Sequence, residues 1–319
     1  MKCTKILALG ECMANLDICS SLSATIQFSG DVYNALVYAK RWDPQLDTFF
    51  VSAVGHDKLS QLMLRDAQQN KIDCSLVLSM DEQNLGIYTI STDDKGQASF
   101  DYWRQNSAAR RYLDLVKTSE LSAVQAHSSE KSLVYFSGIS LAIFRGSDRE
   151  KFLMFLQKIK SQGAIVAFDP NYRPLLWENQ ADASSFTERC YAFADIILPG
   201  LDDHMGLFGH RSLQEMRDYF ARYKGKEIVI KGNSEGMLAI DPSGSTHTLA
   251  LTPARRQLDD TAAGDSFAGI YLASRCSGDN IDTALQHAAN VAREVVMHKG
   301  AIVPEQHFEQ FLYNMHAST

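Results

Sequence analysis

The chain has 319 residues, of which 45% are hydrophobic and 22% charged, and its formal net charge is -7 at pH 7. This composition is typical of a globular protein with a large core, so it excludes disordered and fibrous classes. There is no clustered Lys and Arg patch of the kind that binds nucleic acid, and no stretch approaches the ~20 apolar residues needed to cross a bilayer. We therefore expect neither a nucleic-acid nor a membrane partner.

The first residues form a short apolar run that ends at Glu11. It is too short for a signal peptide and suits a first buried strand. The cysteines show no Cys-x-x-Cys pair and no nearby His at metal-ligand spacing, so we expect them to be reduced and mostly buried, as in a cytoplasmic protein. They are Cys3, Cys12, Cys19, Cys74, Cys190 and Cys276.

Short apolar runs alternate with helical patterns along the chain. The runs lie at 5–10, 49–55, 133–138, 164–169, 195–199 and 227–232, and they are apolar throughout, as in a parallel sheet covered on both faces. Ser147 with Glu150 and Ser212 with Glu215 predict capping boxes at two helix starts, and Gly163 predicts the end of the first helix. The alternation predicts an α/β fold with a doubly wound, mostly parallel sheet flanked by helices.

Two segments interrupt this alternation. Residues 11–30 are polar and extended, and residues 86–103 form two alternating runs joined by Asp93, Asp94, Lys95 and Gly96, the pattern of a β-hairpin. We predict a small projecting β-sheet, made from about 11–34 and 84–106, that forms a lid over a ligand site. No linker or repeat divides the chain, so residues 1–319 are predicted to be a single domain.

The run DDTAAGDSFAGIYLAS at 259–274 places small residues and an acid at the start of an apolar helix. Backbone N–H groups in the first turn of a helix lack intrahelical partners and attract anions. The small side chains of Ala262, Ala263 and Gly264 leave these groups accessible, which predicts an anion hole. Asp265 is either a helix cap or the base that takes a proton from a hydroxyl attacking a bound phosphate.

This run resembles the C-terminal signature D-T-x-G-A-G-D of the ribokinase-like (PfkB) sugar kinases. Further matches follow in the family's order over nearly the whole chain: Gly10-Glu11, Ser29-Gly30-Asp31 with Asn34, Val54-Gly55 with Asp57, Lys231-Gly232 to Gly236, and Ala301. Within the family, three segments are most similar to kinases of 2-dehydro-3-deoxygluconate. They are Gly86-Ile87-Tyr88, Tyr102-Trp103-Arg104 with Ser107-Ala108-Ala109-Arg110, and Asp169-Pro170-Asn171-Tyr172-Arg173-Pro174.

The resemblance implies a ribokinase-like fold and ATP-dependent phosphorylation of 2-dehydro-3-deoxy-D-gluconate to 2-dehydro-3-deoxy-6-phospho-D-gluconate. Asp265 is then the general base, and Ala262, Ala263 and Gly264 hold the γ-phosphate. Mg2+ is expected to be bound mainly through phosphates and water, with Asp203 as the candidate protein ligand. The other residues expected on the nucleotide side are Asn171, Lys231, Gly232, Ser234, Gly236 and Asn290.

The substrate side should contain a fixed cation, because a 2-keto-3-deoxy acid has a carboxylate that a neutral sugar lacks. The family pattern places Arg104 and Arg173 there, and a guanidinium pairs with a carboxylate bidentately. For Arg104, an ion pair with Asp101 or Glu11 on the surface is the alternative. The other expected substrate contacts are Gly30, Asp31, Asn34, Tyr88, Tyr102 and Asp265.

Two residues depart from the family pattern. Ser29 replaces the first glycine of a Gly-Gly-Asp turn, which either crowds the sugar or adds a hydrogen bond. Ala262 replaces a glycine, and its methyl group permits the anion hole if its φ is negative.

Trp103 should point away from the lid face that Phe100, Tyr102 and Arg104 share. We therefore expect it to pack within the lid or to contact a second subunit in a homodimer formed through the lid.

Several alternatives remain at this point. A kinase of fructose or another neutral sugar would tolerate the loss of Arg104 and Arg173, and a non-catalytic sugar-binding sensor would not need Asp265. A glycosidase of the same fold would not need the γ-phosphate hole. The gluconate and galactonate epimers of the acid sugar differ only in hydroxyl geometry.

Overall fold

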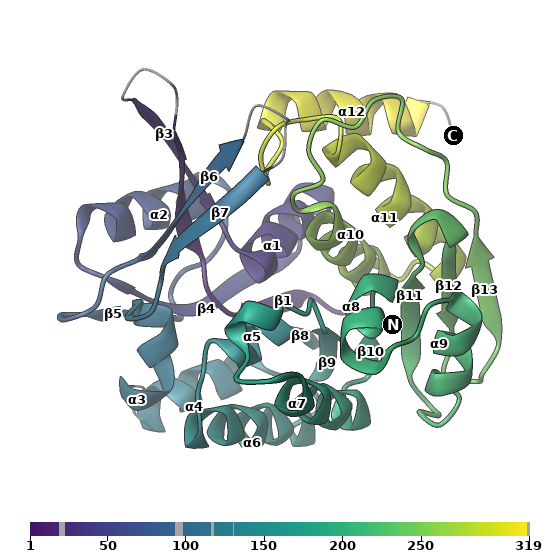
Figure 1. Ribbon diagram of the computed structural model, residues 1–319, viewed down its shortest axis with the longest axis horizontal. Helices are drawn as coiled ribbons and strands as arrows, with labels where there is room; N and C mark the ends of the chain where they lie inside the picture. Colours follow the sequence, from purple (N-terminus) through teal and green to yellow (C-terminus); the bar gives the residue numbers. More distant parts are fainter. Residues whose placement is uncertain (19–22, 93–97, 116–117, 130, 318–319) are drawn as a thin grey trace.

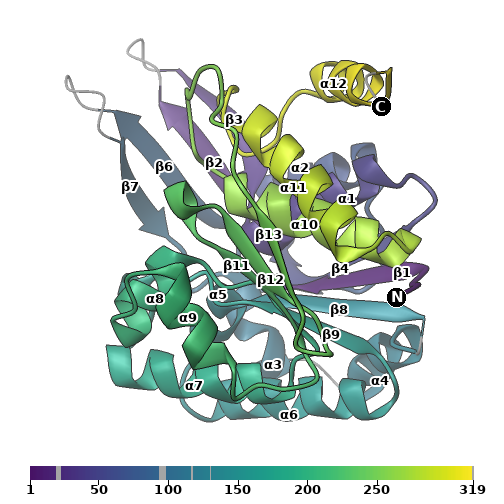
Figure 2. The same ribbon diagram turned by 90° about the vertical axis from the view of Figure 1, so that its right-hand side faces the viewer.

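The computed structural model describes residues 1–18, 23–92, 98–115, 118–129 and 131–317. A nine-stranded sheet is covered by helices on both faces, and a separate four-stranded sheet projects from one edge of this body (Figures 1 and 2). The predicted α/β architecture is therefore confirmed. None of the described helices is long and apolar enough to cross a membrane.

The large sheet has the strand order β13-β12-β11-β10-β9-β8-β1-β4-β5. Its neighbours are parallel except at β12 and β13, which pair antiparallel at one edge. Each of the six predicted strands is present, although the fifth has shortened to two residues ahead of Pro199, which has no N–H to donate to a ladder. The strands are β1 (Lys5–Leu9), β4 (Asp47–Gly55), β5 (Val77–Met80), β8 (Ser132–Ser137), β9 (Ile165–Asp169), β10 (Ile196–Ile197), β11 (Glu227–Lys231), β12 (Met237–Ile240) and β13 (Thr246–Leu249).

The sheet separates two hydrophobic cores, because successive side chains of a strand point to opposite faces. In β1, Ile6 and Ala8 belong to one core and Leu7 and Leu9 to the other. The first core is covered by α1 (Asp31–Trp42), α2 (Lys58–Gln69), α10 (Ala263–Ser277), α11 (Ile281–Val295) and α12 (Glu305–Ala317). The second is covered by α3 (Tyr112–Leu115), α4 (Thr118–His127), α5 (Gly138–Ala142), α6 (Ser147–Ser161), α7 (Gln180–Phe193), α8 (Leu201–Phe208) and α9 (Leu213–Phe220). Short 3-10 turns are η1 (Ala108–Arg111), η2 (Pro174–Leu176) and η3 (Asn233–Glu235).

The predicted capping box at Ser147 is wrong. Ser147 is already the first residue of α6, and the cap position is taken by Gly146, whose φ of 53° suits glycine. The hydroxyl of Ser147 therefore does not cap the helix. The other end is as predicted, since α6 stops at Ser161 and Gly163 follows with φ 96°.

The second predicted capping box forms only in part. Ser212 Oγ accepts the N–H of Glu215 at 3.2 Å, as expected for the N-cap of α9. The Glu215 carboxylate instead accepts the N–H of Arg211, one residue before the cap, at 2.6 Å.

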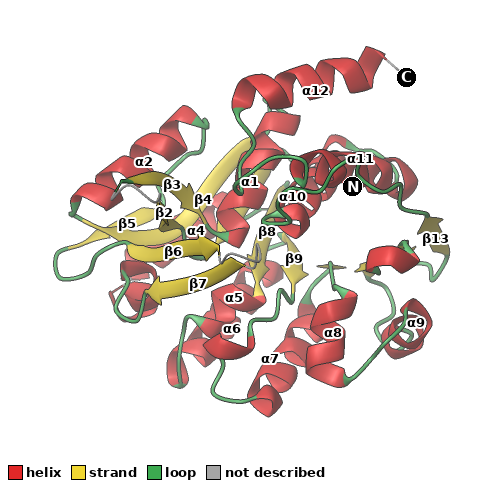
Figure 3. Ribbon diagram, turned by 45° about the horizontal axis from the view of Figure 1, so that its top comes forward, coloured by secondary structure: helices red, strands yellow, loops and turns green. Residues whose placement is uncertain are grey.

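The small sheet has the order β3-β2-β6-β7. Its strands are β2 (Met13–Ile18), β3 (Ala24–Ser29), β6 (Gly86–Thr92) and β7 (Ala98–Trp103), and the parallel pairing of β2 with β6 joins the two distant segments (Figure 3). The predicted hairpin of β6 and β7 is confirmed, while its turn at Asp93–Gly96 lies outside the described residues. Asp31 and Asn34, at the edge of the predicted lid range, lie in the first turn of α1.

The two faces of the lid differ in chemistry. The rings of Tyr88, Phe100 and Tyr102 stack on one face, with centroids 5.8 to 6.5 Å apart. Trp103 lies on the other face, as predicted, and is 58% exposed. Ile18 shares that outer face through its register in β2.

The five cysteines in the described part of the chain form no disulfide, as predicted. Cys74 is half-buried and the other four are buried, whereas Cys19 lies outside the described residues.

Close contact of α10 with α1 depends on Gly269. A Cβ at this position would lie 2.1 Å from the carbonyl oxygen of Ala35, which is backbone and cannot rotate away. We expect Gly269→Ala to lower the free energy of unfolding by about 3 kcal/mol, measured by urea denaturation. Gly264→Ala in the same helix is the matched control, because its Cβ would meet only Lys231 Nζ at 3.9 Å. Equal losses in the two variants would contradict this account.

Candidate active site

Several of the predicted site residues lie at or just after the carboxyl ends of parallel strands, or in the first turns of α1 and α10. The strand order reverses between β1 and β8, and open α/β sheets bind ligands at such a point. Glu11 follows β1, Asp169 ends β9 and Lys231 ends β11. A Cβ on Gly264 would lie 3.9 Å from Lys231 Nζ, so the first turn of α10 lies at the same edge.

Asp265 is half-buried in the first turn of α10. Asn34 Nδ2 donates to its Oδ2 at 2.8 Å and also to Ser29 Oγ at 3.1 Å. Burial and, next, the charge of Asp31 raise the pKa of Asp265 to about 7, although Asn34 and Arg173 act in the opposite direction. A carboxyl group with a pKa near neutrality suits a general base. The Ser29 departure therefore adds a hydrogen bond to the residue that orients Asp265.

The backbone at the start of α10 decides whether the methyl group of Ala262 meets the condition set for the anion hole. Its φ is 61°, in the left-handed region, so the condition of a negative φ is not met and the methyl group lies at a position where glycine is favoured. The N–H of Ala263 donates to the Asp260 carbonyl at 3.2 Å, and the N–H of Ser266 donates to the Ala262 carbonyl at 2.8 Å. The N–H groups between them, on Gly264 and Asp265, belong to the first turn and lack intrahelical partners, which suits an anion.

The left-handed backbone conformation of Ala262 is strained for a residue other than glycine. We expect Ala262→Gly to raise the free energy of unfolding by about 0.5–1 kcal/mol, because it removes a strained conformation at a small cost in chain entropy. Ala263→Gly, at the next position inside the helix, should instead lower it by up to about 1 kcal/mol. Urea denaturation of both variants checks the prediction, and a loss of stability in Ala262→Gly would contradict it.

Lys231 and two acids form a charged group beside this turn. Lys231 Nζ donates to Asp169 Oδ2 at 2.7 Å. Burial raises the pKa of Asp169 to about 6 although Lys231 opposes the shift, and burial also raises the pKa of Asp203. Asp203 Oδ1 accepts the Tyr172 N–H at 2.7 Å and its Oδ2 the Gly200 N–H at 3.3 Å.

These carboxylates fit a cation that is bound mostly through other groups. No three or more His, Cys, Asp or Glu side chains gather into a metal cage in the described ranges. Asp169 is already paired with Lys231, and each oxygen of Asp203 already accepts a backbone N–H. This donor set suits Mg2+ that keeps its waters and is bound by phosphates.

The remaining predicted nucleotide residues lie on separate elements. Gly232 and Gly236 close a tight turn, in which the Gly232 N–H donates to the Gly236 carbonyl at 2.9 Å, and Ser234 is exposed between them. Asn290 lies half-buried on α11, where its Oδ1 accepts from Gln286 Nε2 at 3.1 Å. No described contact joins Asn290 to the turn.

Asn171, predicted on the nucleotide side, contacts a residue that lines a pocket. It has a φ of 33°, and its Nδ2 donates to Asp31 Oδ2 at 2.8 Å. Asp31 is 8% exposed and lines the pocket described next. Asn171 therefore orients the carboxylate of Asp31 in this structure.

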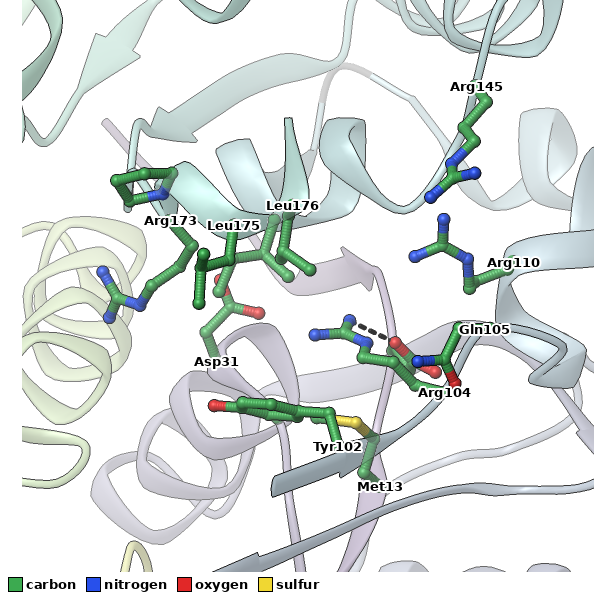
Figure 4. A pocket seen from close by; sticks show the side chains of 14 residues that line it. Met13, Asp31, Tyr102, Arg104, Gln105, Arg110, Arg145, Arg173, Leu175 and Leu176 are labelled. Atoms are coloured by element: carbon green, nitrogen blue, oxygen red, sulfur yellow. Dashed lines mark hydrogen bonds and ion pairs between the residues drawn. The ribbon is translucent and has the colours of Figure 1, made fainter. Parts of the chain in front are cut away.

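A pocket of about 330 Å³ lies between the lid and the sheet edge (Figure 4). Of the predicted substrate contacts, Gly30, Asp31, Tyr102, Arg104 and Arg173 line it, whereas Asn34, Tyr88 and Asp265 do not. The full lining is Glu11, Met13, Gly30, Asp31, Tyr102, Arg104, Gln105, Arg110, Ile139, Arg145, Arg173, Pro174, Leu175 and Leu176.

Two of these predicted contacts are fixed by close packing. Tyr88 is buried against the Tyr102 ring, and burial raises its pKa to about 12. A Cβ on Gly30 would lie 2.0 Å from the Glu11 carbonyl oxygen, so this position needs glycine.

Arg104 is paired inside the protein rather than on its surface. Its guanidinium forms an ion pair with Glu11, whose other oxygen accepts from Ser107 Oγ. Arg104 is 6% exposed and Glu11 is 3% exposed. Glu11 was one of the two alternative partners predicted for Arg104, but the ion pair was expected on the surface. Because the pair is buried, it is not a weak surface contact.

The prediction missed three charged residues of the pocket: Glu11, Arg110 and Arg145. Glu11 and Arg110 stand within segments that resemble the kinase family, which was an available signal. Arg145 follows α5 in a loop with no recognisable pattern, and only the fold brings it to the pocket.

Comparisons with known proteins identify the family of the chain. Residues 4–307 match the pfkB family carbohydrate kinase. The chain is 35% identical to the 2-dehydro-3-deoxygluconokinase of Escherichia coli (strain K12), covering 95% of this chain and 98% of the relative. It is 32% identical to the enzyme of that name from Dickeya dadantii (strain 3937), covering 95% and 98%.

Solved structures show the same fold. Aminoimidazole riboside kinase from Salmonella enterica superposes with a TM-score of 0.80 at 21% identity, covering 97% of this chain and 99% of that chain. Fructokinase from Vibrio cholerae O395, solved with fructose, ADP and calcium ion, gives a TM-score of 0.80 at 19% identity, covering 95% and 96%. The chain therefore belongs to the pfkB family of carbohydrate kinases and has the ribokinase-like fold that this family's signature implied.

Proposed function

We propose that this kinase transfers the γ-phosphate of ATP to the terminal hydroxyl of 2-dehydro-3-deoxy-D-gluconate, giving 2-dehydro-3-deoxy-6-phospho-D-gluconate. The observation that supports this substrate is the pocket itself, where four arginines face two carboxylates beside the first turn of α10. An acid sugar suits this excess of positive charge better than a neutral sugar does. The relatives at 32–35% identity bear the name of that activity.

In the proposed reaction, Asp265 accepts the proton of the sugar hydroxyl while the oxygen forms its bond to the γ-phosphorus. The bond from this phosphorus to the β,γ-bridging oxygen breaks, and ADP leaves. The N–H groups of Gly264 and Asp265 hold the charge that develops on the phosphoryl oxygens. Lys231 Nζ, close to Gly264, adds a fixed cation there. Asn34 keeps Asp265 in place through its 2.8 Å hydrogen bond.

The nucleotide is proposed to lie over the turn from Gly232 to Gly236, with Ala262, Ala263 and Gly264 at its phosphates. Ser234 is exposed at this turn, and Asn290 is the candidate on the adenine side. Mg2+ would neutralise phosphate charge, with Asp203 as a water-mediated ligand. Asn171 is proposed to act between the two substrates, since its hydrogen bond reaches Asp31.

The sugar is proposed to lie in the pocket among Gly30, Asp31, Asn34, Tyr88 and Tyr102, with its carboxylate neutralised by arginine. The family pattern implies that Arg104 and Arg173 contact the sugar, and Arg104 is already paired with Glu11. Arg173 also lowers the pKa of Asp265 by its charge, so it lies toward the reacting end of the sugar.

Coupled ADP release tests this function, with ATP and magnesium and with 2-dehydro-3-deoxygluconate, fructose or ribose as the acceptor. We expect turnover on the acid sugar with a kcat/KM far above that of the neutral sugars. If fructose is the better acceptor, the chain is a neutral-sugar kinase. If no acceptor stimulates ADP release, a sugar-binding sensor becomes the better account.

We also propose a homodimer formed through the lid. The outer face of the lid carries Ile18, Ile26 and Trp103, whose exposed fractions are 58%, 46% and 58%. Apolar side chains on an exposed sheet are typical of protein contacts. Trp103→Lys should shift the protein toward a smaller species in sedimentation velocity, and an unchanged sedimentation coefficient would contradict the proposed dimer.

A further inference from the structure

Arg110 and Arg145 carry the unbalanced charge of the sugar pocket. Their guanidinium groups point toward one another at one end of the pocket (Figure 4). Arg104, next to them, is already paired with Glu11. Within the described ranges, neither Arg110 nor Arg145 has a carboxylate at ion-pair distance. The negative charge of Glu178 interacts electrostatically with both Arg110 and Arg145. Its carboxylate, however, forms an ion pair with Arg149 at 3.1 Å.

Both arginines stand on anchored backbone. In η1, the Arg110 N–H donates to the Ser107 carbonyl at 3.1 Å, and the Ser107 side chain is bound to Glu11. The Arg145 carbonyl accepts the Asp148 N–H at 3.1 Å. The fold therefore keeps the two side chains at the same end of the pocket although they lie far apart in the sequence.

Placing these cations together is unfavourable without an anion. Burial lowers the pKa of Arg110; the charge of Glu11 opposes this shift, whereas the charges of Arg104 and Arg145 add to it. An anion bound between the two guanidinium groups would attract both of them and so offset their mutual repulsion. It would also accept hydrogen bonds from their N–H groups. The pocket is large enough for a six-carbon sugar to lie alongside this pair.

We propose that Arg110 and Arg145 form a subsite for the carboxylate of the acceptor sugar. This inference rests on the proposed function. In a 2-keto-3-deoxy acid of six carbons, the carboxylate and the reacting hydroxyl are at opposite ends of the chain. In the pocket, Arg173 lies on one side of Asp31 and the pair lies on the other (Figure 4). Arg104, held by Glu11, then positions the sugar between the two ends.

The test compares Arg110→Gln, Arg145→Gln and the double variant with the wild type. Arg111→Gln is the matched control, because Arg111 is exposed one residue further along and does not line the pocket. Isothermal titration calorimetry with 2-dehydro-3-deoxygluconate, without ATP, gives Kd at low and high salt. We expect each single variant to weaken binding about tenfold and the double variant about 100-fold, with a smaller salt dependence. KM should rise by more than kcat falls, and Arg111→Gln should stay within about twofold of wild type.

The variants Arg110→Lys and Arg145→Lys retain the charge and should recover part of the affinity, which a purely structural role would not produce. A double glutamine variant that binds the acid sugar within about threefold of wild type would overturn the subsite and leave the proposed function standing. A wild-type enzyme that binds fructose but not the acid sugar would overturn both. Tighter binding of fructose 6-phosphate than of the acid sugar would overturn the assignment to a carboxylate.

Discussion

Asp265→Asn is expected to lower kcat by about 10³–10⁴-fold with the acid sugar as acceptor. The amide keeps the size of the side chain but cannot accept the hydroxyl proton, while the first turn of α10 remains to bind phosphate. Coupled ADP release measures the effect. Asp260→Asn is the matched control, because it makes the same charge change in an exposed side chain of the same run. Comparable activity in Asp265→Asn and Asp260→Asn would show that Asp265 only caps the helix.

The raised pKa of Asp265 adds a pH dependence to this prediction. The base works when ionised, so kcat/KM should rise with pH through about 7, the pKa of this carboxyl group. Its folded pKa lies above the unfolded value of about 4. The group's contribution to stability is therefore fully present below pH of about 4 and is lost as the pH rises through about 7. Thermal unfolding of Asp265→Asn should show a smaller fall in stability over this window than the wild type.

Arg104→Met is expected to have the largest effect on stability, lowering the free energy of unfolding by about 3–5 kcal/mol. The reason is that Glu11, 3% exposed, would keep its charge without a partner. Urea denaturation measures the loss. The double variant Glu11→Met/Arg104→Met should recover most of it, because both charges are then removed.

The control for this prediction is an exposed ion pair of good geometry. Arg189 and Glu150 lie 2.6 Å apart with side chains 44% and 48% exposed. Arg189→Met should cost about 1 kcal/mol, since solvent screens the pair. If Arg104→Met costs no more than Arg189→Met, the buried pair does not stabilise the fold.

Much of the fold could be predicted because its signals are local. Six fully apolar runs became strands of the large sheet, and the small residues before an apolar helix placed the first turn of α10. The errors also have local causes. Gly146 took the cap position predicted for Ser147 because the chain enters α6 through a positive φ. The left-handed φ of Ala262 could not be read from its residue type, since alanine rarely adopts it.

The pocket could be predicted only in part, because it is assembled from distant segments. Arg104 and Arg173 were found through the family pattern, but Arg104 is paired with Glu11, which lies 93 residues away in the sequence. Arg145 reaches the pocket from the loop between α5 and α6, where nothing in the sequence indicates a ligand. Charge balance inside a cavity is a property of the fold, so it becomes visible only when the lining is known.

The most direct test of the central claim is the position of the phosphate in the product. The wild-type enzyme should be incubated with ATP, magnesium and 2-dehydro-3-deoxygluconate, and the product examined by ³¹P–¹H correlation NMR. We predict a new phosphate ester whose phosphorus couples to the two protons of the terminal methylene group, absent with Asp265→Asn. A phosphorus coupled to a secondary carbon's proton, or inorganic phosphate as the only product, would contradict the account.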